Sequence, residues 1–583
     1  MIAEGIIKSV SGPVIKVSGS KSFQMHELVT VGKEELMGEV IGIDEDGAIV
    51  QIYESTEGLS VGAAVKGKGE PLSVLLGPGL MGNIFDGIER PLKVLEGLSG
   101  PFIKRGVVPP AIDTEKKWPV KFCVKEGDSV TGGVVIATTE ETSSITHKIM
   151  VPPNVSGTIT YLAPSGDYTI NDVIAKVDQT DITMAQKWPV RFARPSKKRL
   201  ESNILLVTGQ RIIDTLYPLA KGGTAAIPGG FGTGKTMTQH QLAKWSDADI
   251  IVYIGCGERG NEMTQVLTEF SSLVDPRTGK SLLDRTILIA NTSNMPVAAR
   301  EASIYTGITL AEYYRDMGYS VAIMADSTSR WAEALREISG RLEEMPAEEG
   351  FPAYLASRLS EFYERAGLYE SLNGSTGSIT IIGAVSPTGG DLSEPVTQNT
   401  KRFVKTFWAL DKSLAYARHY PAIDWNSSYS NYYTELEPWI QENLGDKFME
   451  QRSKIRKLLA EETKLMEIVK LIGSDVLPDD QKLTLEIAKV IREGFLQQNA
   501  FVENDSYCPL KKQAAMINII IYLHEKCAAL IDKFNMPISV LKSEGIFESV
   551  IAMKREMSSS GEESDNYIKK IDEFYKTVIR KNG

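Results

Sequence analysis

The sequence predicts a multidomain α/β protein with an N-terminal β-barrel over residues 1–70 and an inserted β-rich module over 110–190. A parallel-sheet core over 195–435 and a C-terminal α-helical domain over 436–583 follow. Three observations lead to this division. Short β-branched runs between turns fill the first two parts, apolar strands alternate with helical segments in the third, and the apolar spacing becomes helical in the fourth. A chain of 583 residues has room for several domains.

Composition restricts the class of protein. Hydrophobic residues make up 42% and charged residues 24% of the chain, as in ordinary globular proteins. The net charge of −11 argues against a nucleic-acid motor, whose strand-tracking surface should be basic. The sequence has no run of 18 apolar residues and no signal-peptide pattern at its N-terminus. Its four cysteines are scattered, so we expect a reduced, intracellular chain.

The N-terminal half of the chain reads as two β modules. Residues 4–17, 38–43 and 48–53 are short β-rich runs, whose spacing suggests a small closed barrel. A glycine-rich connector over 71–109 follows. The module over 110–190 shows no residues that suggest chemistry, so we expect a docking or scaffold role.

The third part alternates strands and helices. Four apolar runs are candidate strands, namely 249–255, 286–291, 320–326 and 378–385. Unbroken apolar strands between helices are typical of a mainly parallel sheet covered on both faces.

Beyond residue 435 the apolar residues follow helical spacing. They form two stripes: Leu465, Ile468, Val469 and Ile472, then Leu483, Ile487, Val490 and Ile491. Pro478 separates the two helices, and we interpret both stripes as core packing.

A glycine-rich loop carries the most specific chemistry. Gly229, Gly234, Lys235 and Thr236 satisfy G-x-x-x-x-G-K-[ST], between an apolar strand over 224–227 and a helix over 237–245. Its backbone N–H groups can converge on phosphates, the lysine adds positive charge, and the threonine offers a hydroxyl to Mg²⁺. We therefore predict a nucleotide site formed by Gly229, Gly230, Phe231, Gly232, Thr233, Gly234, Lys235 and Thr236. The alternative is a glycine-rich turn that binds nothing.

Two carboxylates follow buried strands. Asp326 ends the run 320–326, where it can hold Mg²⁺, although it could also cap the next helix. Glu258 follows the strand 249–255, at the sheet edge where ligands bind, and could polarise the attacking water. Arg259 could pair with Glu258 or approach the phosphates. The alternative for these two residues is a purely structural Glu–Arg pair.

Several segments together resemble the catalytic A subunit of the vacuolar/archaeal-type rotary ATPases. They are the glycine loop, 255–262, 290–305, 325–337 and 341–346, and the resemblance extends over essentially the whole chain. The inserted β module distinguishes this subunit from the β subunit of F-type ATP synthases.

The resemblance implies a RecA-like core that binds ATP or ADP with Mg²⁺. It implies a headpiece of three A and three B subunits, with an arginine finger from B, around a central rotor shaft and with peripheral stalk subunits. Lys235 and Thr236 then handle phosphate and metal, Glu258 orients water beside Arg259, and Asp326 completes the metal shell. The complex would couple ATP turnover to H⁺ or Na⁺ movement in a membrane sector, with this chain at the cytoplasmic face of the membrane.

The resemblance also implies an adenine pocket. Residues 419–424 resemble the family segment that places an aromatic ring against the base, which makes Tyr420 the candidate. Phe501 would supply a second ring. Either ring could instead fill core.

Two positions depart from the family pattern. The family loop commonly reads Gly-Pro-Phe-Gly, whereas this chain has Gly230 in place of the proline. We expect altered nucleotide affinity and intact catalysis. Thr233 stands where eukaryotic relatives carry cysteine, which favours a bacterial or archaeal enzyme.

Two other functions remain alternatives. A hexameric RecA-like helicase would need a basic, aromatic N-terminal module, which residues 1–70 do not offer. A non-catalytic nucleotide-binding subunit should lack the Lys235–Thr236 pair or Glu258, and all three residues are present. We therefore expect a catalytic subunit that does not bind nucleic acid.

Overall fold

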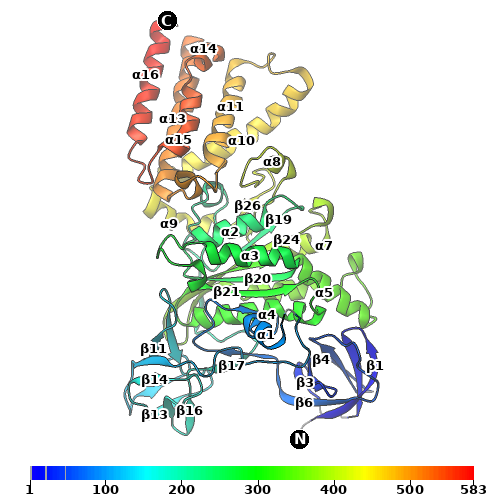
Figure 1. Cartoon of the computed structure of the whole chain (residues 1–583). Coiled ribbons are helices and arrows are strands. Elements are labelled where there is room, and N and C mark those ends of the chain that lie inside the picture. The colour runs from blue at the N-terminus through cyan, green and yellow to red at the C-terminus, as the bar shows by residue number, and fades with distance from the viewer. Residues whose placement is uncertain (1–2, 20–22, 46, 101, 583) are drawn as a thin grey trace. The chain divides into compact units, whose positions relative to one another are not determined.

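The computed structural model describes residues 3–19, 23–45, 47–100 and 102–582 (Figure 1). The chain forms two compact units. The first holds the chain up to Glu201, Lys221–Ala226 and Ala248–Val404. The second holds Ser202–Ala220, Ile227–Asp247 and the chain from Lys405 on.

The first unit begins with a closed six-stranded barrel, as the sequence predicts. Its strands pair in the order β1-β2-β5-β4-β3-β6. They are β1 (Glu4–Ser11), β2 (Val14–Gly19), β3 (Glu27–Val31), β4 (Leu36–Asp44), β5 (Gly47–Ile52) and β6 (Ala64–Pro71). Valines and isoleucines such as Val29, Val40 and Val50 fill the interior. Residues 1–2, 20–22 and 46 of the predicted barrel segment lie outside the described residues.

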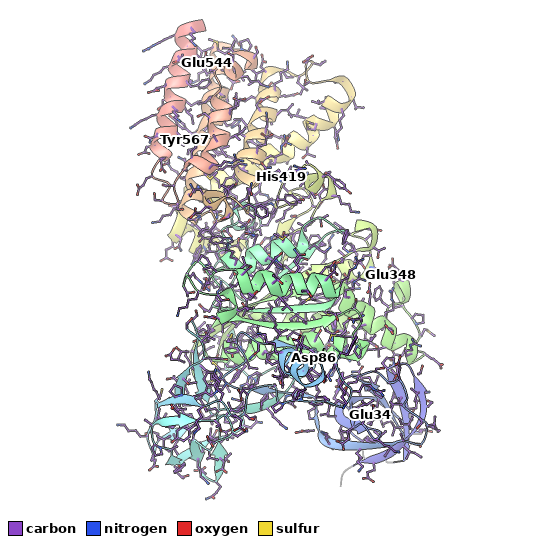
Figure 2. The ribbon with its side chains drawn as sticks, viewed as in Figure 1. Glu34, Asp86, Glu348, His419, Glu544 and Tyr567 are labelled. Carbon is purple, nitrogen blue, oxygen red and sulfur yellow. The ribbon has the colours of Figure 1, made fainter. Side chains whose placement is uncertain are left out.

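The connector joins the barrel to the rest of this unit. It contains β7 (Ser73–Leu76), β8 (Ile84–Phe85) and α1 (Leu92–Ser99). Arg105 bonds back to Glu34 of the barrel at 3.0 Å; Figure 2 labels Glu34. β8 pairs in parallel with β21 (Thr286–Thr292), so the connector adds an edge strand to the core sheet.

The inserted module consists of two four-stranded sheets. One has the order β10-β13-β15-β16, with β10 (Ser129–Val130), β13 (Gly157–Leu162), β15 (Ala175–Val177) and β16 (Thr180–Ile182). The other has the order β12-β11-β9-β14, with β12 (Thr146–Met150), β11 (Val135–Glu140), β9 (Trp118–Phe122) and β14 (Gly166–Tyr168). The chain leaves the module through β17 (Gln186–Pro189), which pairs with β7.

The core sheet contains the four predicted strands. In order along the sheet these are β24 (Thr376–Val385), β22 (Ser320–Asp326), β20 (Ile250–Glu258) and β21, and neighbouring strands pair in parallel. β19 (Thr224–Pro228) lies beside β24, while β23 (Gly367–Glu370) pairs antiparallel to β24 and also pairs with β18 (Lys198–Leu200). Besides α1, the α-helices described in this unit are α3 (Gly260–Ser272), α4 (Val297–Asp316), α5 (Thr328–Arg341), α6 (Leu355–Glu364) and α7 (Pro395–Phe403).

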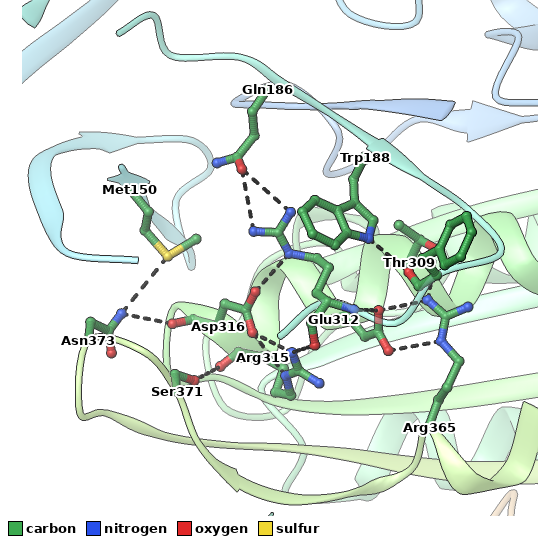
Figure 3. Close-up of polar contacts among 12 residues, drawn as sticks. Met150, Gln186, Trp188, Thr309, Glu312, Arg315, Asp316, Arg365, Ser371 and Asn373 are labelled. Carbon is green, nitrogen blue, oxygen red and sulfur yellow. Dashed lines mark hydrogen bonds and ion pairs between the residues drawn. The ribbon is translucent and has the colours of Figure 1, made fainter. Parts of the chain in front are cut away.

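Helix α4 holds the first unit together. Every residue from Ala298 to Asp316 is buried. Its C-terminal end fixes the chain that leaves the inserted module, because Asp316 accepts from Arg194 at 2.7 Å. Figure 3 shows Glu312 beside Arg365, from which it accepts at 2.7 Å, and Arg365 donates in turn to the Val190 carbonyl at 2.8 Å. Buried ion pairs of this kind fix geometry through several bonds at once.

The same helix contacts the other parts of the unit. Arg191 lies between Glu39 of the barrel, at 2.6 Å, and Glu301 of α4, at 2.8 Å. In the inserted module, His147 bonds to Glu141 at 2.8 Å and to Tyr313 of α4 at 2.9 Å. Burial alone would raise the pKa of Glu141, but His147 and two backbone N–H groups hold it below its ordinary value. The module is therefore attached to α4 by a satisfied, fully buried polar network.

The second unit is mainly helical. Besides α2 (Lys235–Trp245), α8 (Lys412–Tyr416) and the short pair β25 (Thr406–Phe407) and β26 (Tyr429–Ser430), it contains a C-terminal set of helices. They are α9 (Tyr433–Leu444), α10 (Lys447–Ile472), α11 (Asp479–Val490), α12 (Glu503–Ser506), α13 (Leu510–Phe534), α14 (Ile538–Ser543), α15 (Ile546–Glu556) and α16 (Ser564–Asn582).

The prediction of core packing is wrong for the C-terminal end of one of the two apolar stripes. Leu483, Ile487, Val490 and Ile491 are buried, as expected. In α10, Leu465 is buried, but Ile468 is 41% and Ile472 56% exposed. Helical spacing shows which residues share a face, but it does not show whether another element covers that face.

Helix α13 is, among the described residues, the one helix long and apolar enough to cross a membrane by length and composition. Its buried residues include Met516, Ile520, Leu523 and Leu530, which belong to the core of the helical domain. A core helix passes the same test.

Candidate functional site

The glycine loop has the backbone that its sequence requires. β19 ends at Pro228 and α2 begins at Lys235. Gly232 and Gly234 have φ of 77° and 91°, in the left-handed region that favours glycine. A Cβ on Gly229 would lie 2.6 Å from the Thr233 hydroxyl oxygen, so packing also requires glycine there. The loop therefore leads its backbone into a helix N-terminus, an arrangement that suits anions.

Side chains inside the loop stabilise its shape. The Lys235 ammonium donates to the carbonyl of Gly229 at 2.7 Å and to that of Gly230 at 3.3 Å. Thr233 is buried, and its hydroxyl donates to the Gly230 carbonyl at 2.8 Å. Thr236 is the second residue of α2, where its hydroxyl belongs to the first helical turn.

Aromatic side chains of the second unit lie near this loop or on the surface. The Tyr420 ring is 3.6 Å from the position of a Cβ on Gly234 and is 43% exposed. Phe231, within the loop, and Phe501 are both strongly exposed. Tyr420 therefore has an accessible ring face beside the loop, while Phe501 lies on the surface of the same unit.

The two predicted carboxylates lie at the carboxyl ends of neighbouring strands in the first unit. β20 continues to Glu258, three residues beyond the predicted strand end, and Gly255 lies opposite Asp326 of β22. Asp326 is buried and accepts a hydrogen bond from Tyr253 at 3.1 Å. It does not act as the N-cap of α5, because that position belongs to Ser327.

The protonation of Glu258 depends on its neighbours. Burial raises its pKa to about 8, with contributions from the charge of Asp326 and a hydrogen bond with Glu262. Arg330 opposes this rise. Arg259 is exposed at the start of α3, and among the described residues it forms no ion pair with Glu258. The structure therefore does not contain the proposed structural Glu–Arg pair.

Comparison with known proteins decides the family. Four sequence models match consecutive parts of the chain. These are the ATP synthase alpha/beta β-barrel domain (residues 7–69), the barrel-sandwich domain (109–191), the nucleotide-binding domain (209–430) and the C-terminal domain of V and A type ATP synthases (437–535).

Whole-length relatives carry the same family names. The chain is 57% identical to the V-type ATP synthase alpha chain 2 of Clostridium tetani and 55% identical to the A subunit of the A-type ATP synthase of Methanopyrus kandleri. Each alignment covers 99% of this chain and 98% of the relative. The chain belongs to the A subunits of V-type and A-type ATP synthases.

A solved structure shares the fold of this protein. The assembled ATPase EscN of the enteropathogenic E. coli type III secretion system matches with a TM-score of 0.65 at 21% identity. The match covers 89% of this chain and all of that one. At this identity the likeness supports the fold alone.

The carboxyl groups of this ATP synthase protein fit Mg²⁺. The charges of Asp326 and Glu262 both act on Glu258, and a cation would relieve this accumulation of negative charge. The described residues contain no group of three or more His, Cys, Asp or Glu side chains that could hold a metal alone. Mg²⁺ commonly binds through one or two protein carboxylates together with water and phosphate oxygens, so it does not require such a group.

The structure also reveals two arginines to which the sequence had assigned no role. A Cβ on Gly257 would lie 2.7 Å from the Arg330 Cβ and 3.0 Å from the Arg300 Cδ. Arg300 is buried, and its Nε has no hydrogen-bond partner in the described part of the chain. Both arginines therefore lie beside the segment that carries Glu258. Both arginines lie in segments that carry the family resemblance, which was the available signal in the sequence. Sequence reasoning missed them because their proximity to Glu258 depends on the order of the strands in the sheet.

Proposed function

We propose that this protein hydrolyses or synthesises ATP in a rotary complex and couples the reaction to H⁺ or Na⁺ movement across a membrane. The observation that carries the proposal is the half-buried Glu258 carboxyl beside Asp326, at adjacent strand ends. This is the edge of a parallel sheet at which ligands bind. The glycine loop supplies the matching anion-binding chemistry on the same chain.

Each residue has a stated role in this proposal. In the loop over residues 229–234, backbone N–H groups hold the phosphates, except at Gly230, where the family loop commonly carries proline and so offers no N–H. Lys235 exchanges its carbonyl partners for phosphate oxygens. Thr236 and Asp326 hold Mg²⁺, which supplies charge neutralisation at the phosphates when it is bound. Glu258 in its ionised form accepts the proton of the attacking water, while Arg259 lies beside it. Tyr420 and Phe501 place rings against adenine.

The assembly and location follow from the family. We propose alternating A and B subunits, with nucleotide at their interfaces and an arginine finger from B. A central rotor shaft and peripheral stalk subunits complete a complex at the cytoplasmic face of the membrane. We also retain the domain boundaries 1–70, 71–109, 110–190, 195–435 and 436–583 as a proposal.

Reconstitution with the B protein tests the catalytic role. Glu258→Gln should lower ATP turnover about 100-fold or more while ATP still binds, because the amide cannot accept the proton. Glu269→Gln, on the helix that follows Glu258, is the matched control and should keep normal turnover. Turnover of the Glu258→Gln complex within about twofold of wild type would reject the role of Glu258.

The same assay tests the two alternatives. A non-catalytic subunit would bind ATP in the wild-type complex without turnover. A helicase would show turnover that increases when RNA is added.

A further inference from the structure

A cavity of about 470 Å³ lies in the first unit, between the connector and the core. Its walls come from the end of the barrel, the connector around α1, one face of α3 and the turn between β21 and α4. A volume of this size is typical of sites for small molecules.

The walls of this cavity are mostly apolar. Leu92, Ile103, Met263, Leu267, Met295 and Pro296 contribute side chains, and Phe102 stands at the rim with 82% of its surface exposed. An aromatic ring exposed at the edge of an apolar cavity can close over an apolar ligand.

The charged residues of the lining are already paired. Arg90 bonds to Asp86 at 2.7 Å and to Glu54 at 3.3 Å, and both carboxylates are buried; Figure 2 labels Asp86. Arg105 pairs with Glu34 at 3.0 Å. A charged ligand would lose its hydration and find these charges neutralised, so the lining favours an uncharged ligand.

One polar side chain can orient such a ligand. The Asn294 side-chain oxygen accepts from the Thr292 hydroxyl at 2.5 Å, which fixes the amide. Its NH₂ group carries two further donors. A ligand with a carbonyl or hydroxyl oxygen suits these donors.

The walls are connected directly to Glu258. Gly260, the first residue of α3, lines the cavity two positions after Glu258. The backbone carbonyl of Glu258 accepts from Ser293 at 2.9 Å, between the lining residues Thr292 and Asn294. A molecule in the cavity would therefore contact both segments that hold the Glu258 backbone.

We propose that this cavity is a regulatory site for an uncharged, mostly apolar small molecule that carries a carbonyl or hydroxyl group. Occupation restrains α3 and the turn before α4, and thereby changes the turnover rate. The regulatory part rests on the proposed ATP turnover, whereas binding does not depend on it.

The binding test uses the full chain and 6-propionyl-2-dimethylaminonaphthalene, an uncharged, mostly apolar probe that carries a carbonyl group and whose fluorescence rises in apolar surroundings. Excess ATP is present so that the probe does not bind to the Tyr420 and Phe501 rings at the nucleotide site. The probe is excited at a wavelength at which tryptophan does not absorb. We expect saturable binding. Thr264→Trp, which places a large side chain from an exposed position on α3 into the cavity, should weaken it by about tenfold or more.

Thr268→Trp is the matched control, one turn further along α3 at an exposed position outside the lining. It should bind the probe like wild type. Equal circular dichroism spectra and melting temperatures for both variants show that the fold is kept. Probe binding that does not saturate, or that Thr264→Trp leaves unchanged, overturns the proposal.

The regulatory test uses the reconstituted complex. Saturating probe should change ATP turnover of the wild-type complex severalfold and leave that of the Thr264→Trp complex unchanged. Saturable binding with unaltered wild-type turnover overturns the regulatory part. A complex without any turnover rejects the proposed function instead, and the binding result still stands.

Discussion

The hydroxyl of Tyr253 donates to the carboxylate of Asp326 at 3.1 Å, between adjacent parallel strands of the core sheet. Burial and the charge of Asp326 raise the pKa of Tyr253 well above its ordinary value, so the hydroxyl keeps its proton. Tyr253 therefore orients the carboxylate to which we assign Mg²⁺.

We expect Tyr253→Phe to raise the Mg²⁺ concentration for half-maximal turnover about tenfold, because a hydrogen bond to a charged group is lost. Titration of the reconstituted complex with Mg²⁺ measures this change. Tyr522→Phe is the control, since it removes a similar bond to Asp572, of 2.7 Å, within the helical domain. Equal Mg²⁺ dependence of the two variants would contradict the orienting role.

Arg191 stabilises the attachment of the barrel to α4. Its removal in Arg191→Met leaves Glu39 and Glu301 buried without their shared cation, and we expect a loss of about 3–5 kcal/mol in unfolding free energy. Arg191 holds the pKa of Glu39 far below its ordinary value of 4.5, although burial opposes this. The contribution of ionised Glu39 to the free energy of unfolding is therefore present above pH 4.5. It disappears as the pH falls from there towards the lowered pKa.

Chemical unfolding followed by fluorescence measures the effect of Arg191→Met. Lys187→Met breaks an exposed pair with Glu70 and should cost less than about 1 kcal/mol. Similar losses in the two variants would show that the buried position of Arg191 gives no advantage.

Asp214 gives the second unit a pH dependence of opposite sign. Its carboxylate accepts from Thr208, Gly209 and Gln513, yet burial raises its pKa from 3.8 to about 6. The folded state then binds more protons than the unfolded state between these values. The contribution of Asp214 to stability therefore falls by about 3 kcal/mol as the pH rises through this window.

Asp214→Asn has no titrating group at this position. The melting temperature of Asp214→Asn should therefore lie further below that of the wild type near pH 4 than near pH 7. Thermal unfolding at both pH values measures the difference. A cost that is equal at both values, or larger at pH 7, would contradict the raised pKa.

The exposed end of α10 should tolerate polar substitution. Leu471 is 84% exposed, and Leu471→Ser should change the unfolding free energy by less than about 0.5 kcal/mol. Leu465→Ala, on the buried part of the same helix, should cost about 2–3 kcal/mol. Urea unfolding of both variants measures this contrast, and equal costs would place Leu471 in the core.

Gly230 offers a test of the unusual loop. Gly230→Pro restricts the unbound loop, and we expect ATP to bind about two- to fivefold more tightly with turnover retained. Gly232→Pro is the contrasting variant, because its φ of 77° is inaccessible to proline and binding should weaken. Weaker binding in both variants would reject the expected effect of Gly230.

Local patterns in the sequence predicted much of the fold. The strand over 320–326 is observed with the same ends, and the helix after the glycine loop begins at Lys235, where the loop ends. Pro478 directly precedes α11, as expected. These features depend on apolar spacing, glycine and proline, which act over a few residues.

Contacts between distant segments could not be predicted in this way. The bond between Tyr253 and Asp326 depends on which strands become neighbours, and Arg191 meets Glu39 across 152 positions of sequence. The exposed end of α10 has the same spacing as its buried part, so spacing alone could not distinguish them. The roles of the site residues came from motif order together with family resemblance.

Helix α4 is linked to the barrel through Glu301 and the intervening Arg191. It contacts the connector through Thr306, and the inserted module through Tyr313 and Tyr314. Substitutions made in these three parts should therefore not be additive, because each part is coupled to the others through one shared element. The inserted module is accordingly not an independent cassette. A chimera that exchanges it between relatives has to bring the partner residues of α4 with it.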